Sequence, residues 1–93
     1  MATTNTNTSI LSNLAVSRAY AAGAYANAYT SAEWLTALTA WCNKLGHEAQ
    51  RVEIDAFLAG FYGSYTSAEI VTDTGGMQSV MRHVGRYRAA HGA

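Results

Sequence analysis

The chain has 93 residues, of which 49% are apolar and 13% are charged. This proportion of apolar residues excludes an intrinsically disordered protein and predicts one small folded domain. Six acidic and six basic residues give a formal net charge of zero. A neutral chain is neither a strongly basic nucleic-acid binder nor an acidic mimic of DNA.

The cysteine content and the distribution of apolar residues predict where the protein resides. The single cysteine, Cys42, excludes an intramolecular disulfide framework and is typical of a reducing compartment. Residues 1–5 lack the basic region and apolar run of a signal peptide. Arg18 and Asn27 interrupt the most apolar stretch, so no run reaches the ~20 residues that a membrane span needs. We expect a cytoplasmic protein with no membrane partner.

The N-terminal part of the chain changes character at Ser9. Residues 1–8 are mostly threonine and asparagine without hydrophobic periodicity, which predicts a disordered tail. Residues 9–93 carry helical periodicity and no proline, which predicts a single helical domain. Ser9 is a suitable N-cap for a helix over about residues 10–28.

Two stripes run along this first predicted helix. One face combines large and small residues: Leu11, Leu14, Ala15, Arg18, Ala22, Tyr25 and Tyr29. A second stripe has a small residue at every fourth position, namely Ala15, Ala19 and Gly23. Small side chains allow another helix backbone to approach closely. The spacing leaves open whether that backbone belongs to the same bundle or to a second subunit.

A five-residue sequence occurs twice. Tyr29-Thr30-Ser31-Ala32-Glu33 recurs at residues 65–69, and each copy follows a helical segment. A hydroxyl residue followed three residues later by glutamate is the pattern of a helix-starting capping box. We therefore predict boxes at Thr30 with Glu33 and at Thr66 with Glu69. Both recurring capping and a duplicated helical hairpin would produce this repetition.

The second predicted helix covers about residues 31–45. Its apolar positions follow a regular amphipathic spacing: Trp34, Leu35, Leu38, Trp41, Cys42 and Leu45. Gly46 follows this stripe and is a candidate for the left-handed residue that ends many helices.

The remaining segments complete an all-α pattern. A third helix is predicted over about residues 47–63, with Ile54, Phe57 and Leu58 on its large-residue stripe and Ala56 and Gly60 on a small-residue stripe. A short helical turn is predicted over residues 66–72 and a last helix over about residues 77–90. In the last helix Met77, Val80, Met81, Val84 and Tyr87 are predicted to face inward, and Gln78, Arg82 and Arg86 outward. The fold predicted is a compact bundle of four main helices plus a short helical turn, with a homodimer left open.

One candidate nucleic-acid site surrounds Gly46. Cys42, Gly46 and Val52 have the spacing of a helix-turn-helix, which would place Gln50 and Arg51 at the first base contacts. The acidic residues of the same segment would repel phosphates: Glu48, Glu53 and Asp55. We therefore favour an ordinary corner between two helices and keep DNA binding as the alternative.

A second candidate site combines arginines and tyrosines. Arg82, Arg86 and Arg88 lie close together near one end of the chain with no acidic residue beside them. Tyrosine and arginine are enriched at protein interfaces, and a small domain cannot bury all its aromatic residues. The predicted partner-binding residues are Arg82, Arg86, Arg88, Tyr20, Tyr25 and Tyr62. A solvated helix face whose cations complement the helix dipole is the alternative interpretation of the arginines.

The sequence contains no recognisable catalytic or metal-binding pattern. Cys42 and His47 do not have a zinc-ligand spacing, and no second cysteine is present to complete a closed site. Cys42 lies on an apolar stripe, where a thiol packs as a small hydrophobic group. We expect no metal, no cofactor and no enzyme activity.

The function predicted is that of a small protein-binding module that occludes a surface of a partner protein. By analogy of size and character alone, such chains are common among phage and mobile-element proteins that inhibit host machinery, including CRISPR inhibitors. The alternatives are a helix-turn-helix DNA-binding regulator and a structural subunit that self-assembles. The identity of the partner is not encoded in any motif of this sequence.

Overall fold

The computed structural model describes the backbone of residues 2–63 and 67–91 and the side chains of residues 13–63 and 70–91. Five helices follow one another in the chain: α1 (Ala2–Tyr29), α2 (Trp34–Lys44), α3 (Arg51–Tyr62), α4 (Ser67–Thr74) and α5 (Met77–His91). The described residues contain no strand. The predicted all-α fold, with four main helices and one short helix, is therefore confirmed.

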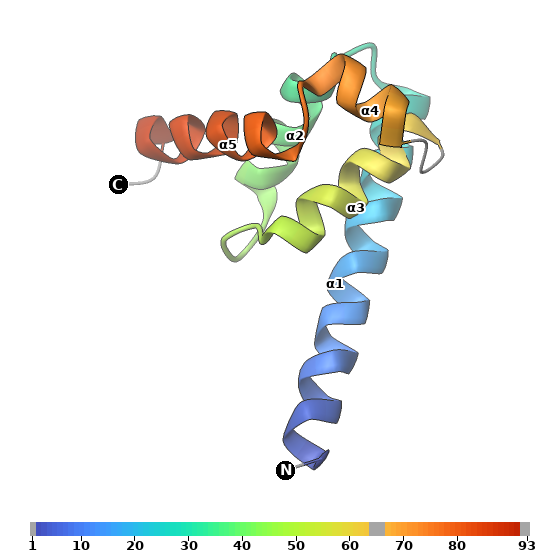
Figure 1. The fold of residues 1–93 in the computed structure, drawn as a ribbon, viewed down its shortest axis with the longest axis vertical. Helices are drawn as coiled ribbons and strands as arrows, with labels where there is room; N and C mark the ends of the chain where they lie inside the picture. The colour runs from blue at the N-terminus through green and yellow to red at the C-terminus, as the bar shows by residue number, and fades with distance from the viewer. Residues whose placement is uncertain (1, 64–66, 92–93) are drawn as a thin grey trace.

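The helices pack around the second half of α1 and around α3. Figure 1 shows α3 crossing α1 obliquely, while the first half of α1 extends away from the other helices. α2 packs on α3 and α5, and α4 joins α3 to α5. At 1.5 Å per residue, the 28 residues of α1 span about 42 Å.

The contact between α1 and α3 depends on two glycines. A Cβ added to Gly23 would overlap the Phe57 carbonyl oxygen and lie 2.8 Å from the Phe61 nitrogen. A Cβ added to Gly60 would overlap the Tyr20 carbonyl oxygen and lie 3.1 Å from the Ala24 nitrogen. Each glycine thus occupies a groove between two residues of the other helix. The predicted close approach at the small-residue stripe is made within one chain.

The hydrophobic core lies between α3 and the helices around it. Its largest fully buried side chains are Phe57, Leu38, Ile54, Leu58, Val80 and Val84. The Trp41 and Phe57 rings stack with centroids 4.9 Å apart and an interplanar angle of 23°. The inward stripes predicted for α2, α3 and α5 supply these residues, whereas α1 contributes small residues such as Ala19 and Ala26.

α1 begins at Ala2, eight residues before the predicted start at Ile10. The predicted tail over residues 1–8 is therefore helical from Ala2 onward in the structure. Residues 2–22 contain no glycine or proline that would interrupt a helix. Extending an existing helix adds one hydrogen bond for each residue fixed, which is much easier than starting a new one.

The capping box predicted at Thr30 and Glu33 is wrong. The Thr30 hydroxyl donates to the Ala26 carbonyl at 2.6 Å and so completes the end of α1. Glu33 is itself the N-cap of α2 in an extended conformation, and its side chain makes no capping hydrogen bond. α2 therefore starts at Trp34 rather than Ser31. The second copy, with Tyr65 and Thr66 and the side chain of Glu69, lies outside the described residues.

The corner between α2 and α3 also differs from the prediction. Gly46 is not left-handed; the positive-φ glycines of the described chain are Gly63, Gly75 and Gly76. α2 ends instead through the extended Leu45, whose N–H donates to the Trp41 and Cys42 carbonyls. Those bonds satisfy the helix end without a left-handed residue. α3 starts at Arg51 rather than His47, so residues 45–50 form a connector.

Candidate protein-binding surface

The large apolar residues of the α1 stripe whose side chains the structure describes are exposed to solvent. Leu14 is 48% exposed, Tyr25 is 64% exposed and Tyr29 is 74% exposed. The Tyr25 and Tyr29 rings lie one helical turn apart, with centroids separated by 4.7 Å. Because the small-residue face of α1 packs on α3, the wider aromatic face is left at the surface.

This face of α1 borders a groove whose other wall is α2. A cavity of about 530 Å³ is lined by Leu14, Arg18, Trp41, Leu45 and His47, among others. A second cavity, of about 290 Å³, is lined by residues that include Ala22, Tyr25, Thr36, Trp41 and Lys44. Trp41 lines both cavities, so they adjoin. We call this feature the α1–α2 groove.

Two cations in the α1–α2 groove are unpaired within the part of the chain that the structure describes. Arg18 and Lys44 form no hydrogen bond or ion pair with the described residues. The acidic residue that lines the groove, Glu53, is only 3% exposed. Its carboxylate is hydrogen-bonded to His47 and to the Gln50 backbone N–H. The charge that the groove presents to a ligand is therefore positive.

Glu53 organises the corner between α2 and α3. Its Oε1 accepts a hydrogen bond from the Gln50 backbone N–H at 3.0 Å, as the glutamate of a capping box does. Its Oε2 lies 2.8 Å from His47 Nε2, which must be the donor because a carboxylate oxygen only accepts. A buried carboxylate is tolerated when both oxygens are bonded in this way. The connector is thus fixed to the first turn of α3.

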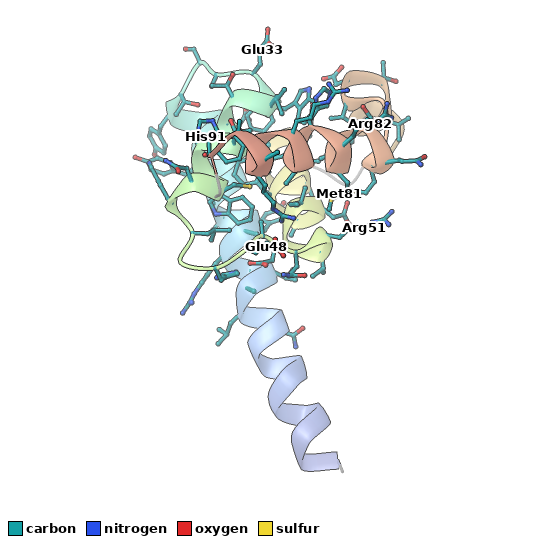
Figure 2. All side chains as sticks on the ribbon, turned by 90° about the vertical axis from the view of Figure 1, so that its left-hand side faces the viewer. Glu33, Glu48, Arg51, Met81, Arg82 and His91 are labelled. Carbon is teal, nitrogen blue, oxygen red and sulfur yellow. The ribbon has the colours of Figure 1, made fainter. Side chains whose placement is uncertain are left out.

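Arg88 fixes the same connector from α5. Its guanidinium donates to the Ala49 carbonyl, and its Nη1 lies 3.4 Å from Glu48 Oε1. Figure 2 looks onto α5 and shows Glu48 beneath the middle of this helix. Arg88 was also predicted as a partner-binding residue, and in the structure its side chain bonds to the connector.

Cys42 lies beside this corner, partly buried. Burial raises the pKa of its thiol, and Glu53 adds to the rise, while the nearby Arg88 guanidinium opposes it. His47, the nearest candidate base in the sequence, is bonded to Glu53. A raised pKa keeps the thiol protonated, which is the less nucleophilic form.

The other predicted partner-binding residues are distributed over different faces. Arg82 and Arg86 are exposed on the outer face of α5, as predicted. Tyr20 is 41% exposed on α1. Tyr62 is half-buried, with its ring edge-to-face on Phe61 at 5.4 Å. Among the described residues, none from α5 lines the α1–α2 groove, so the arginines and Tyr25 do not form one surface.

Gln50 and Arg51, the alternative DNA-binding pair, are both exposed at the start of α3. In Figure 2, Arg51 lies on the same side of the molecule as Arg82, with Met81 between them. Arg51 and Met77 also line one cavity of about 430 Å³. The connector of six residues before Arg51 is longer than the three or four residues typical of a helix-turn-helix.

Comparison with protein-family models, with curated proteins and with solved structures gives no match. Within the described residues, no group of three or more His, Cys, Asp or Glu side chains could hold a metal ion. None of the described helices is both long and apolar enough to cross a membrane. The geometry of the chain itself is therefore the basis for a functional proposal.

The α1–α2 groove is a feature that the sequence analysis missed. The available indication was Arg18 in the middle of the large-residue stripe of α1, because a charged residue is seldom buried without a partner. The sequence indicates that stripe but not its exposure. The stripe is exposed because the small-residue stripe of α1, which contains Gly23, packs against α3 instead.

Proposed function

We propose that this chain is a non-catalytic protein-binding module that covers a surface of a partner protein with the exposed aromatic face of α1. The observation that carries this proposal is the pair Tyr25 and Tyr29, which are adjacent and largely exposed. Tyrosine supplies a large contact area at a small cost in conformational entropy, and it is enriched among the residues that dominate binding energy.

The surroundings of the two tyrosines support the same proposal. The groove beside them is lined by Trp41, which is stacked on Phe57, and by small residues of α1 such as Ala22 and Ala26. An exposed aromatic face next to an apolar groove, bordered by cations, resembles the core and rim of a protein interface. Inhibition of a larger complex by occlusion is the mode of action that we propose for such a surface.

Recovery of a partner from host lysate tests this function. The tagged chain is compared with the double variant Tyr25→Ser/Tyr29→Ser and with Arg82→Ala/Arg86→Ala, a matched pair on the outer face of α5. We expect a stoichiometric, nuclease-resistant partner with the wild type and the arginine variant, and its loss with the tyrosine variant. Circular dichroism checks that all three chains are equally helical. Equal recovery with the tyrosine variant would refute this binding surface.

DNA binding is a second candidate because Gln50 and Arg51 are exposed at the start of α3, on the same side as Arg82. Two of the acids that would repel phosphate are also paired: Glu53 with His47 and Glu48 with Arg88. A gel-shift assay at low salt with the wild type and Arg51→Ala tests it. Binding to duplex DNA that weakens steeply with salt and with the substitution would support this function.

A further inference from the structure

We infer that the α1–α2 groove binds an amphipathic helix that carries acidic side chains on its flanks. This inference rests on the proposed protein-binding function and specifies the chemistry of the partner. It is carried by the dimensions of the groove, by the residues that line it and by its charge.

The groove has the length and shape that a helix requires. Leu14, Arg18, Tyr25 and Tyr29 follow one face of α1 over about 22 Å, which corresponds to about four turns of a bound helix. The two adjoining cavities lie along this face, with volumes of about 530 and 290 Å³. Helix-in-groove recognition uses such a trough to receive side chains at positions i, i+3, i+4 and i+7 of the partner.

The lining of the groove favours bulky apolar side chains in the partner. Ala22, Ala26 and Ala37 line one cavity, and their small size leaves the space above them empty. Trp41 lies where the two cavities adjoin, held against Phe57 by ring stacking. A rigid aromatic surface beside small residues receives leucine or phenylalanine side chains with little loss of conformational freedom.

The charge of the groove selects an acidic partner. Arg18 and Lys44 have no partner among the described residues, and Glu53 is occupied by His47 and by the Gln50 N–H. A basic helix would place its cations against Arg18 and Lys44, whereas an acidic helix would form charge-assisted hydrogen bonds with them.

A second copy of this chain does not provide such a helix. The sequences of α1, α2 and α5 contain no acidic residue. α3 contains Glu53 and Asp55, but its apolar face forms the core of its own subunit. α4, with Glu69 and Asp73, has only eight residues and spans about 12 Å. Helices α1–α5 of a second copy therefore do not fit, and the occupant that we infer is a helix of a different protein.

Designed peptides test this inference without knowledge of the natural partner. The probe is a fluorescently labelled amphipathic peptide of about 16 residues, with leucine on one face and glutamate on both flanks. Two matched peptides carry lysine in place of each glutamate, or the same residues in scrambled order. Fluorescence anisotropy against the full chain gives each affinity. We expect the glutamate peptide to bind at least about tenfold more tightly than either control.

Variants of the groove identify the site of binding. Arg18→Glu/Lys44→Glu is expected to reverse the preference, so that the lysine peptide binds more tightly. Thr36→Trp, which fills the groove from an exposed position, should abolish binding, whereas Gln78→Trp on the outer face of α5 should not. Circular dichroism of each variant verifies its helicity.

Three outcomes would overturn the inference: no binding of the glutamate peptide, equal affinity for both charged peptides, or displacement of the peptide by duplex DNA with the same dependence on Arg18 and Lys44. None of these would refute the proposed function, because recovery of a protein that depends on Tyr25 and Tyr29 is measured separately. Conversely, equal recovery of the partner by the wild type and by Tyr25→Ser/Tyr29→Ser, together with charge-selective peptide binding, would leave the groove assignment in place and refute only occlusion by the tyrosines.

Discussion

Gly23 of α1 and Gly60 of α3 each fit against the backbone of the other helix, so the two glycines form a reciprocal contact at the crossing point. Neither position has space for a methyl group, because the nearest atoms belong to the backbone and cannot rotate away. Close packing of this kind gains dispersion energy along both helices and leaves no gap at the crossing. The position of α1 relative to the rest of the molecule therefore depends on two residues without side chains.

Substitution of either glycine by alanine tests this contact. Gly23→Ala and Gly60→Ala should each reduce the free energy of unfolding by about 1–3 kcal/mol, because the added methyl group forces the helices apart. Urea denaturation followed by circular dichroism measures the change. Gly85→Ala is the matched control: no atom lies within 4 Å of its added Cβ. Because Gly85 lies in the middle of α5, Gly85→Ala should increase the free energy of unfolding by about 0.5–1 kcal/mol. A neutral Gly23→Ala would contradict the observed crossing.

The buried carboxylate of Glu53 should be essential to the corner. Glu53→Ala leaves the Gln50 N–H and His47 without their acceptor and should cost about 1–3 kcal/mol of unfolding free energy. Glu53→Gln retains one acceptor oxygen and should cost less. Thermal and urea denaturation measure both, with Glu48→Ala as an exposed acidic control. If Glu48→Ala proved as damaging as Glu53→Ala, the capping interaction would not be what holds the corner.

Arg88 should differ from its neighbours Arg82 and Arg86. Arg88→Ala removes the hydrogen bond to the Ala49 carbonyl and should reduce the free energy of unfolding by about 1–2 kcal/mol. Arg82→Ala and Arg86→Ala, on the exposed face of the same helix, should change it by less than about 0.5 kcal/mol. Denaturant titration of the three variants separates an internal role from a surface role. Equal effects of all three would exclude the internal role.

The thiol of Cys42 should react slowly and only at high pH. Because burial raises the pKa of this thiol, the folded protein retains the proton at a pH where an unfolded cysteine has lost it. The pH at which iodoacetamide alkylation reaches half its maximal rate should therefore be higher for the folded chain than for the same chain in denaturant. Arg88→Ala should raise this pH further, since the Arg88 guanidinium favours the thiolate. Coincident pH profiles of folded and denatured protein would refute this assignment.

The regular apolar stripes allowed much of the core to be predicted. Leu38 on α2, Ile54 and Phe57 on α3, and Val80 and Val84 on α5 occupy the inward positions that their spacing indicates. Gln78, Arg82 and Arg86 are exposed on the opposite face of α5, as predicted. These predictions succeeded because a helix with one apolar and one polar face has only one favourable orientation in a bundle.

The face of α1 could not be assigned in the same way, because both of its stripes consist mostly of apolar residues and only Arg18 distinguishes them. The number and size of apolar residues would favour burial of Leu14, Tyr25 and Tyr29, yet Gly23 on the other stripe is buried against α3. That outcome depends on Gly60, which is 37 positions away and becomes a neighbour only after folding. The corner was mispredicted for a related reason, since the Glu53 carboxylate competes with helix formation by residues 47–50.

The hydrogen bond from Arg88 to Ala49 also bears on the kinetics of folding. It joins residues 39 positions apart, and the loop that it closes contains α3 and α4. Contacts of such separation carry a loop-closure cost. We predict that this one, made by the last helix, forms after the rate-limiting step of folding. Loss of the Arg88 guanidinium should therefore leave the refolding rate nearly unchanged and accelerate unfolding. The contact between α5 and the connector would then determine the unfolding rate, and with it the lifetime of the folded state.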